Sequence, residues 1–190
     1  MYQVDIYGGI TLNTKTDHLL LGLLSHESMT GYDMKKRIDN PIGLFWQAGY
    51  GSIYPALARL EKQGYVSKKS VKDCGREKIE YSITDAGNDK LNEWVKAPAT
   101  RDEMHSETML KIFFGNEAGT QTAEAHIDDF EQRCKTLLPE LERSISLLNE
   151  LDSEPAHKYY MLTAMFGVKV YKTYLEWCKE AKEILAKEEK

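Results

Sequence analysis

Residues 50–66 read YGSIYPALARLEKQGYV, and this stretch decides the fold. Its apolar residues recur at helical spacing: Ile53, Leu57 and Leu60. Such spacing predicts a helix with one apolar face. Ser52 is a candidate N-cap, and Pro55 falls in the first turn, where its missing N–H would have no helical partner in any case. Gly64 is suited to ending the helix, because glycine readily adopts the left-handed conformation often found there.

The segments that precede this stretch predict two further helices. The sequence LLLGLL at residues 19–24 follows Thr16 and Asp17, both of which are good N-cap residues. The sequence TGYDMKKRID at residues 30–39 predicts a weaker amphipathic helix that also begins at an N-cap type. Pro41 ends it, because the residue before a proline disfavours the helical conformation.

After Gly64 the period changes from helix to strand. Residues 65–71 predict one strand, residues 73–75 predict a turn, and residues 78–83 alternate apolar and polar side chains as a half-buried strand does. Thr84 then begins another helix. Three helices followed by a hairpin is the order of a winged helix-turn-helix, in which the third helix reads a DNA groove and the hairpin is the wing.

The second half of the chain reads as helix after a polar linker at 98–104. A short helix is predicted near 105–114, and a long one over 122–151, where apolar residues recur at steps of three and four. Pro139 should kink or split that helix. A last helix is predicted to begin at residues 153–155. Its stretch from Tyr159 to Val168 is apolar nearly all round, so it needs cover on several sides.

The expected fold class is therefore mostly α with a small β-hairpin. We divide the chain into four parts: an unassigned segment 1–16, a winged helix-turn-helix DNA-binding domain 17–97, the linker 98–104, and a helical dimerisation domain 105–190.

Composition excludes several classes of protein. The chain has 190 residues, 42% of them hydrophobic, and a net charge of −5, which is ordinary for a globular protein. The longest nearly apolar stretch is far shorter than the roughly 20 residues of a membrane span, and the N-terminus does not resemble a signal peptide. We therefore expect a cytoplasmic protein with no membrane partner. The region 59–78 is locally basic despite the acidic total.

No catalytic or metal-binding pattern emerges, so we expect neither an enzyme nor a cofactor. Cys74, Cys134 and Cys178 lack the clustered spacing of a zinc site. We interpret them as reduced thiols, and a redox role for Cys74 in its predicted turn is the alternative.

The third helix and the hairpin carry the candidate DNA contacts. Hydroxyls and basic side chains can bind phosphates and base edges, and glycine lets the backbone approach closely. The candidates are Tyr50, Gly51, Ser52, Tyr54, Arg59 and Lys62 on the helix, with Arg76 and Lys78 on the wing. The alternative is the solvated face of a structural helix and an ordinary charged hairpin.

The C-terminal half carries the candidate dimer contacts and ligand contacts. The expected dimerisation residues are Tyr160, Ala164, Gly167, Val170, Tyr171, Tyr174 and Trp177. The aromatic ones among them could instead line a pocket. Trp94 and Trp177 are the candidate contacts to a small aromatic effector.

Three stretches together resemble the PadR family of transcriptional regulators. They are LLLGLLSHESMTGYDMKKRI (19–38), GSIYPALARLEKQGYV (51–66) and GREKIEYSITDAG (75–87). Residues 105–187 resemble, more loosely, the helical C-terminal domain of the larger members, also found in AphA-type virulence activators. In the wing, Glu77 and Glu80 stand where relatives often carry proline and basic residues.

The resemblance implies a homodimer that represses a neighbouring operon by binding a pseudo-palindromic operator. It also implies release by an effector, often a phenolic or another aromatic or cationic compound. By motif match, Tyr50, Gly51, Ser52, Tyr54 and Pro55 would contact double-stranded DNA, together with Arg76 and Lys78. The alternative is a winged-helix ligand-binding or protein-interaction module that does not bind DNA.

Overall fold

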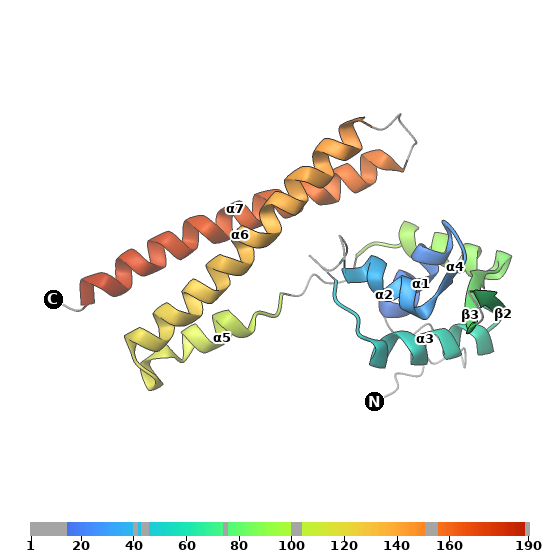
Figure 1. The fold of residues 1–190 in the computed structure, drawn as a ribbon, viewed down its shortest axis with the longest axis horizontal. Coiled ribbons are helices and arrows are strands. Elements are labelled where there is room, and N and C mark those ends of the chain that lie inside the picture. The colour runs from blue at the N-terminus through green and yellow to red at the C-terminus, as the bar shows by residue number, and fades with distance from the viewer. Residues whose placement is uncertain are drawn as a thin grey trace. The chain divides into compact units, whose positions relative to one another are not determined.

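The fold was obtained as a computed structural model, which describes residues 15–39, 42, 46–73, 76–99, 104–150 and 156–188 (Figure 1). The chain forms two compact units, Met1–Arg101 and Asp102–Lys190. The fold class expected from the sequence is confirmed: helices dominate, and the strands form one small antiparallel sheet. Among the described residues, no helix combines the length and apolar character needed to cross a membrane.

In its described residues, the N-terminal unit contains four α-helices and three strands. They are α1 (Lys15–Leu24), β1 (Met29–Thr30), α2 (Gly31–Asp39), α3 (Tyr50–Lys62), β2 (Val66–Asp73), β3 (Arg76–Ile83) and α4 (Asp85–Lys96). One apolar core joins α1, α2 and α3. Its fully buried aliphatic side chains include Leu20, Leu21, Met34, Ile38, Ile53, Leu57 and Leu60. The apolar face predicted for α3 is thus the face that the core covers.

The sheet has the order β1–β3–β2. Strands β2 and β3 form the predicted hairpin, paired from Val66 opposite Ile83 to Asp73 opposite Arg76. Strand β1 was not predicted; it pairs Met29 with Tyr81 and anchors the hairpin to the segment before α2. Two residues are too few to show the alternation by which strands are recognised in a sequence.

The start of α3 differs from the expectation, whereas its end agrees with it. The helix begins after Gly49, and Ser52 lies inside its first turn, where its hydroxyl donates to the carbonyl of Gly49 at 2.9 Å. Ser52 as N-cap is therefore wrong. Gly64 adopts φ +74°, and the N–H of Tyr65 donates to the carbonyl of Leu60 at 2.9 Å, as expected for a glycine-ended helix.

Helix α4 begins at the predicted N-cap, Thr84, whose hydroxyl accepts from the N–H of Gly87 at 3.1 Å. Gly87 also allows a close approach: a methyl group there would lie 2.2 Å from the carbonyl oxygen of Tyr65. The first turn of α4 consequently lies directly on the turn between α3 and β2. This contact fixes the end of α3 and the start of the hairpin together.

The C-terminal unit consists of α5 (Glu107–Phe113), the short 3-10 helix η2 (Gly115–Glu117), α6 (Thr120–Glu150) and α7 (His157–Glu188). Figure 1 shows α6 and α7 side by side as an antiparallel pair, with α5 along the first part of α6. Helix α6 runs without a break through Pro139, so the expected split is wrong. The residues predicted to begin the last helix, 153–155, lie outside the described residues.

Candidate nucleic-acid interface

The outer face of α3 presents two tyrosines one helical turn apart. Tyr50 is 44% exposed and Tyr54 is 48% exposed, and their rings are stacked with centroids 6.1 Å apart and planes 21° apart. Gly51, Ser52 and Pro55 are exposed on the same first turns. The structure therefore brings these five candidate residues onto one surface. We call Tyr50, Gly51, Ser52, Tyr54 and Pro55 the α3 outer face.

Arg59 forms an ion pair within the N-terminal unit while its side chain stays 36% exposed, and its contact with DNA stays a prediction. Its Nη2 donates to Oδ1 of Asp17 at 2.6 Å, and the Asp17 side chain is only 1% exposed. Buried charges are retained in proteins where a partner of opposite charge compensates them. Arg59 thus ties α3 to α1, and Asp17, expected to be an N-cap, is instead its buried partner.

Basic residues lie on the C-terminal turn of α3 and on the hairpin. Lys62 is exposed in the last turn of α3, and Lys78 is exposed on β3. Arg76 begins β3 opposite Asp73. The side chain of Arg76 and the whole of Cys74 lie outside the part of the chain that the structure describes.

Acidic side chains compensate part of the hairpin's positive charge. Lys68 Nζ lies 2.9 Å from a carboxylate oxygen of Glu61, and Lys69 Nζ lies 2.8 Å from one of Glu80. The hydrogen bond to Glu61 raises the pKa of Lys68, with a smaller Coulombic contribution. Glu80, which departs from the family pattern, therefore contacts the neighbouring strand of the hairpin.

The two tryptophans proposed as ligand contacts occupy different surroundings. Trp94, on α4, is 45% exposed and stacks on His18 with centroids 4.7 Å apart. Trp177, on α7, is partly buried with its ring edge-to-face against Phe130 at 6.1 Å. Each tryptophan packs on an aromatic ring of its own unit.

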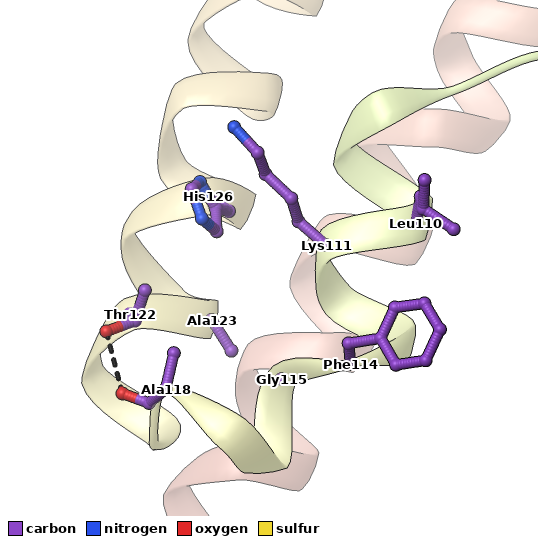
Figure 2. A pocket seen from close by; sticks show the side chains of 8 residues that line it. All are labelled: Leu110, Lys111, Phe114, Gly115, Ala118, Thr122, Ala123 and His126. Atoms are coloured by element: carbon purple, nitrogen blue, oxygen red, sulfur yellow. Dashed lines mark hydrogen bonds between the residues drawn. The ribbon is translucent and has the colours of Figure 1, made fainter.

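A cavity of about 340 Å³ lies between α5 and the start of α6 (Figure 2). Its walls are mostly apolar, with Ala118, Ala123 and Phe114 among them. Lys111 and His126 lie together at one end, as Figure 2 shows. Neither tryptophan lines this cavity, which is therefore a second candidate place for a small aromatic molecule. Among the described residues, no three His, Cys, Asp or Glu side chains gather as metal ligands would.

The residues expected at a dimer interface divide into two sets. Ala164 and Gly167 are buried in the α6–α7 pair, and Tyr174 is half-buried against Phe130, with ring centroids 5.3 Å apart. Tyr171 lies beside Tyr174 at 5.8 Å, and Trp177 contacts Phe130. These side chains pack within the chain, which corrects the expectation for Ala164 and Gly167 in particular. Val170 is half-buried.

The exposed apolar side chains of α7 lie nearer its start. Apart from Ile184, which is 59% exposed near the end of α7, they are Tyr159, Tyr160, Leu162, Met165 and Phe166, between 42% and 62% exposed. We call them the α7 apolar patch. Of the expected dimerisation residues, only Tyr160 belongs to it.

Taken together, α1 to α4 and the hairpin define a winged helix-turn-helix protein with a helical C-terminal unit. Residues 20–93 match the transcriptional regulator PadR-like family, and residues 104–186 match the family of the virulence activator alpha C-terminal domain. The chain therefore combines a PadR-like transcriptional-regulator domain with a virulence-activator C-terminal domain, an arrangement consistent with a larger PadR-type regulator.

Relatives and solved structures agree with this assignment. The negative transcriptional regulator PadR of Bacillus subtilis is 26% identical over 167 residues, which cover 84% of this chain and 91% of the relative. The crystal structure of B. subtilis PadR with operator DNA is 28% identical, with a TM-score of 0.69 over 90% of this chain and 96% of that one.

Two further structures extend the comparison. The structure of B. subtilis PadR with p-coumaric acid is 26% identical, with a TM-score of 0.63 over 92% of this chain and 98% of that one. The Vibrio cholerae virulence activator AphA, 23% identical, shares the fold with a TM-score of 0.67 over 90% of this chain and 98% of that one.

Proposed function

We propose that this protein is a sequence-specific DNA-binding regulator whose α3 outer face enters the major groove. The single observation that carries the proposal is the stacked, exposed Tyr50–Tyr54 pair on the third helix of a winged helix-turn-helix. Hydroxyl groups can exchange hydrogen bonds with base edges and phosphates, and Gly51 and Ser52 leave room for the backbone to approach. The related PadR of Bacillus subtilis has been solved in complex with operator DNA, which supports DNA binding by this fold.

The lysines of α3 and the hairpin add attraction that does not depend on sequence. Lys62 is exposed on the last turn of α3 and Lys78 on β3, and Arg76 begins the same strand as Lys78. Contacts of basic groups to phosphates release counterions and strengthen binding at low salt. We therefore propose that α3 recognises the base sequence and that the hairpin binds the phosphate backbone.

The protein is proposed to act as a homodimer. The α7 apolar patch is exposed in the single chain, and monomeric proteins rarely leave large contiguous apolar surface in water. A second copy related by a two-fold axis can cover the patch with the same patch. Such a pair would place two copies of α3 on half-sites about 34–36 Å apart, which explains a pseudo-palindromic operator.

Repression is the proposed sign of regulation, and a small aromatic compound is the proposed effector. The B. subtilis relative is a negative regulator, and its structure with p-coumaric acid shows the class of ligand to test. A ligand that favours a dimer unsuited to the operator would lower the bound fraction. A regulator of this kind acts in the cytoplasm, where the DNA lies, and its function involves no catalytic step.

Selection of bound duplexes from a random DNA library tests the proposal. Enriched sequences should contain an inverted repeat, and fluorescence anisotropy should give them at least about 1000-fold tighter binding than random DNA. Tyr54→Ala should weaken operator binding by about 1–3 kcal/mol, whereas Val95→Ala, at an exposed apolar position of α4, should not. Equal binding of all sequences by the wild type would contradict sequence specificity, and no binding to any duplex at low salt would favour the alternative, an interaction module that does not bind DNA.

The effector proposal has its own test. A panel of phenolic acids and cationic aromatic compounds is titrated while tryptophan fluorescence and operator affinity are followed. Binding beside Trp94 or Trp177 should quench fluorescence, and Trp94→Phe and Trp177→Phe identify the residue. Ala123→Leu, which fills the α5–α6 cavity, should abolish the response only if the ligand binds there. Unchanged melting temperature and operator affinity with every compound would contradict an aromatic effector.

A further inference from the structure

The ring of Tyr54 lies directly on Gly31, the first residue of α2. A methyl group at position 31 would lie 2.7 Å from Cε1 of Tyr54, 3.0 Å from Cζ and 3.1 Å from the hydroxyl oxygen. Non-bonded carbon atoms in proteins pack at about 3.5–4.0 Å. Any residue with a Cβ at position 31 would therefore displace the ring.

The backbone of Gly31 does not itself require glycine. The described glycines with positive φ are Gly64 and Gly119, so Gly31 lies outside the left-handed region in which side chains are disfavoured. Alanine is also a better helix former than glycine by about 1 kcal/mol. The reason for glycine at this position is thus the ring that rests on it.

Position 31 is a rigid platform because the start of α2 is fixed on both sides. Thr30 accepts from the N–H of Asp33 at 3.2 Å, and its hydroxyl donates to the Asp33 carboxylate at 2.6 Å. Before α2, Thr30 and Met29 form β1, which pairs with β3. Helix α2 cannot easily shift away from a larger residue at position 31.

The ring of Tyr54 is also supported from its own helix. It stacks on Tyr50, one turn earlier, with centroids 6.1 Å apart, yet it remains 48% exposed. A ring that lies on Gly31 and stacks on Tyr50 is held in one orientation while its other surface faces outward. Such preorganisation lowers the entropy lost when an aromatic side chain binds a partner.

We propose that Gly31 is a positioning residue for DNA recognition: its missing side chain sets the depth and direction at which the phenol of Tyr54 meets a base pair. This inference rests on the proposed function, since it assigns a role within the same DNA-binding surface. Gly31 contacts no DNA in this arrangement and acts through Tyr54.

The test is a double-mutant cycle in the full-length protein, with operator affinity and thermal unfolding measured for each variant. Gly31→Ala should weaken operator binding by about tenfold, the scale of one lost base contact. In the Tyr54→Ala background the same substitution should have no effect, because no ring remains to be displaced. A purely structural role would lower the melting temperature and would weaken binding equally in both backgrounds.

A matched control is Gly22→Ala in α1. A methyl group there meets only Cδ1 of Leu91, at 4.0 Å, so operator affinity should be unchanged. Wild-type affinity for Gly31→Ala, or an equal loss with and without Tyr54, overturns the inference while wild-type operator binding still stands. Failure of the wild type to prefer any duplex overturns the proposed function, and the inference with it.

A second measurement avoids any change at position 31, in case Gly31→Ala fails to fold. Selective labelling of glycine and tyrosine in the wild-type protein allows magnetisation transfer between Gly31 α-protons and Tyr54 ring protons to be followed by NMR. The cross-peak should persist from the unbound protein to the operator complex. Its loss on DNA binding would overturn the inference, because the ring would then be positioned by DNA and not by Gly31.

Discussion

The carboxylate of Asp17, buried in α1, accepts a hydrogen bond from the guanidinium of Arg59 at 2.6 Å and so joins α1 to α3 across 42 residues of sequence. The two partners differ in their access to water. The Asp17 side chain is 1% exposed, whereas the Arg59 side chain is 36% exposed. Removing Arg59 therefore leaves a buried carboxylate without its cation, whereas Arg59 without Asp17 can still be hydrated.

This asymmetry predicts different costs for the two deletions. Arg59→Ala should lower the free energy of unfolding by about 3 kcal/mol, and Asp17→Ala by less. The double variant should lose less free energy of unfolding than the sum of the two single losses, because no charge is then left without its partner. Urea unfolding measures all three, with Lys62→Ala as the control at an exposed position of the same helix.

Operator binding distinguishes this holding role from a reading role. At a temperature where Arg59→Ala is fully folded, its operator affinity should lie within about twofold of wild type, since the loss of a base contact would cost about tenfold. A loss of that size in the folded variant would show that Arg59 contacts DNA, as the sequence alone had suggested.

The hairpin is expected to bind DNA without regard to its base sequence. Lys78→Ala should weaken binding to operator and random duplexes alike, and it should reduce the slope of log affinity against log salt by about 1. Lys90→Ala is the control, since Lys90 lies on α4 and pairs with Glu93 at 2.9 Å. A sequence-selective loss for Lys78→Ala would contradict the assignment.

The α7 apolar patch predicts where dimerisation can be broken. Leu162 and Phe166 are each 62% exposed in the single chain, so Leu162→Glu or Phe166→Glu should have little effect on folding of the monomer. Pairing should fail, because a second copy would have to bury the introduced charge. Analytical ultracentrifugation should show monomers, and Lys179→Glu, at an exposed position further along α7, should stay dimeric.

Loss of pairing should also reduce operator affinity by orders of magnitude. Without a tether, the second α3 binds from solution and lacks the roughly millimolar effective concentration that a linked partner supplies. Dimers of unchanged operator affinity would show that another surface holds the copies together.

The thiols of α6 and α7 should be inert in the folded protein. Burial raises the pKa of Cys134 to about 11 and also raises the pKa of Cys178. Since a thiol ionises only as the pH approaches its pKa, Cys134 at pH 8 is ionised in about one molecule per thousand. In a Cys74→Ser variant, Ellman's reagent should therefore react with two thiols only after unfolding. Rapid reaction of either thiol in the native variant would contradict this.

Much of the fold could be predicted because its signals are local. The spacing of Ile53, Leu57 and Leu60 defined the buried face of α3, and alternation around Tyr81 defined the hairpin strand. The Asp17–Arg59 pair could not be predicted this way, because nothing in either local segment shows that the two side chains meet. Charge alone placed Arg59 on the surface, and only the packing of α1 on α3 reveals its partner.

The candidate surfaces were predicted unevenly for the same reason. The α3 outer face follows from helical periodicity around the buried residues. On α7, apolar residues occur on nearly every side, so the sequence could not distinguish Ala164 and Gly167, buried against α6, from Leu162 and Phe166, which are exposed. Ala164 and Gly167 were expected between two chains, but both are already buried within the single chain.

Different residues of α3 pack in the core and face outward, and this affects how such a regulator can change its preferred operator during evolution. The buried residues that hold the helix in the core, Leu57 and Leu60 among them, are not the residues that face outward. On the proposed function, exchanges at the exposed Tyr50 or Ser52 are expected to alter which operator is preferred with little loss of folding stability. Position 54 is less open to exchange, since its side chain packs closely against Gly31. Descendants with new operators are therefore expected to diverge first at the start of α3.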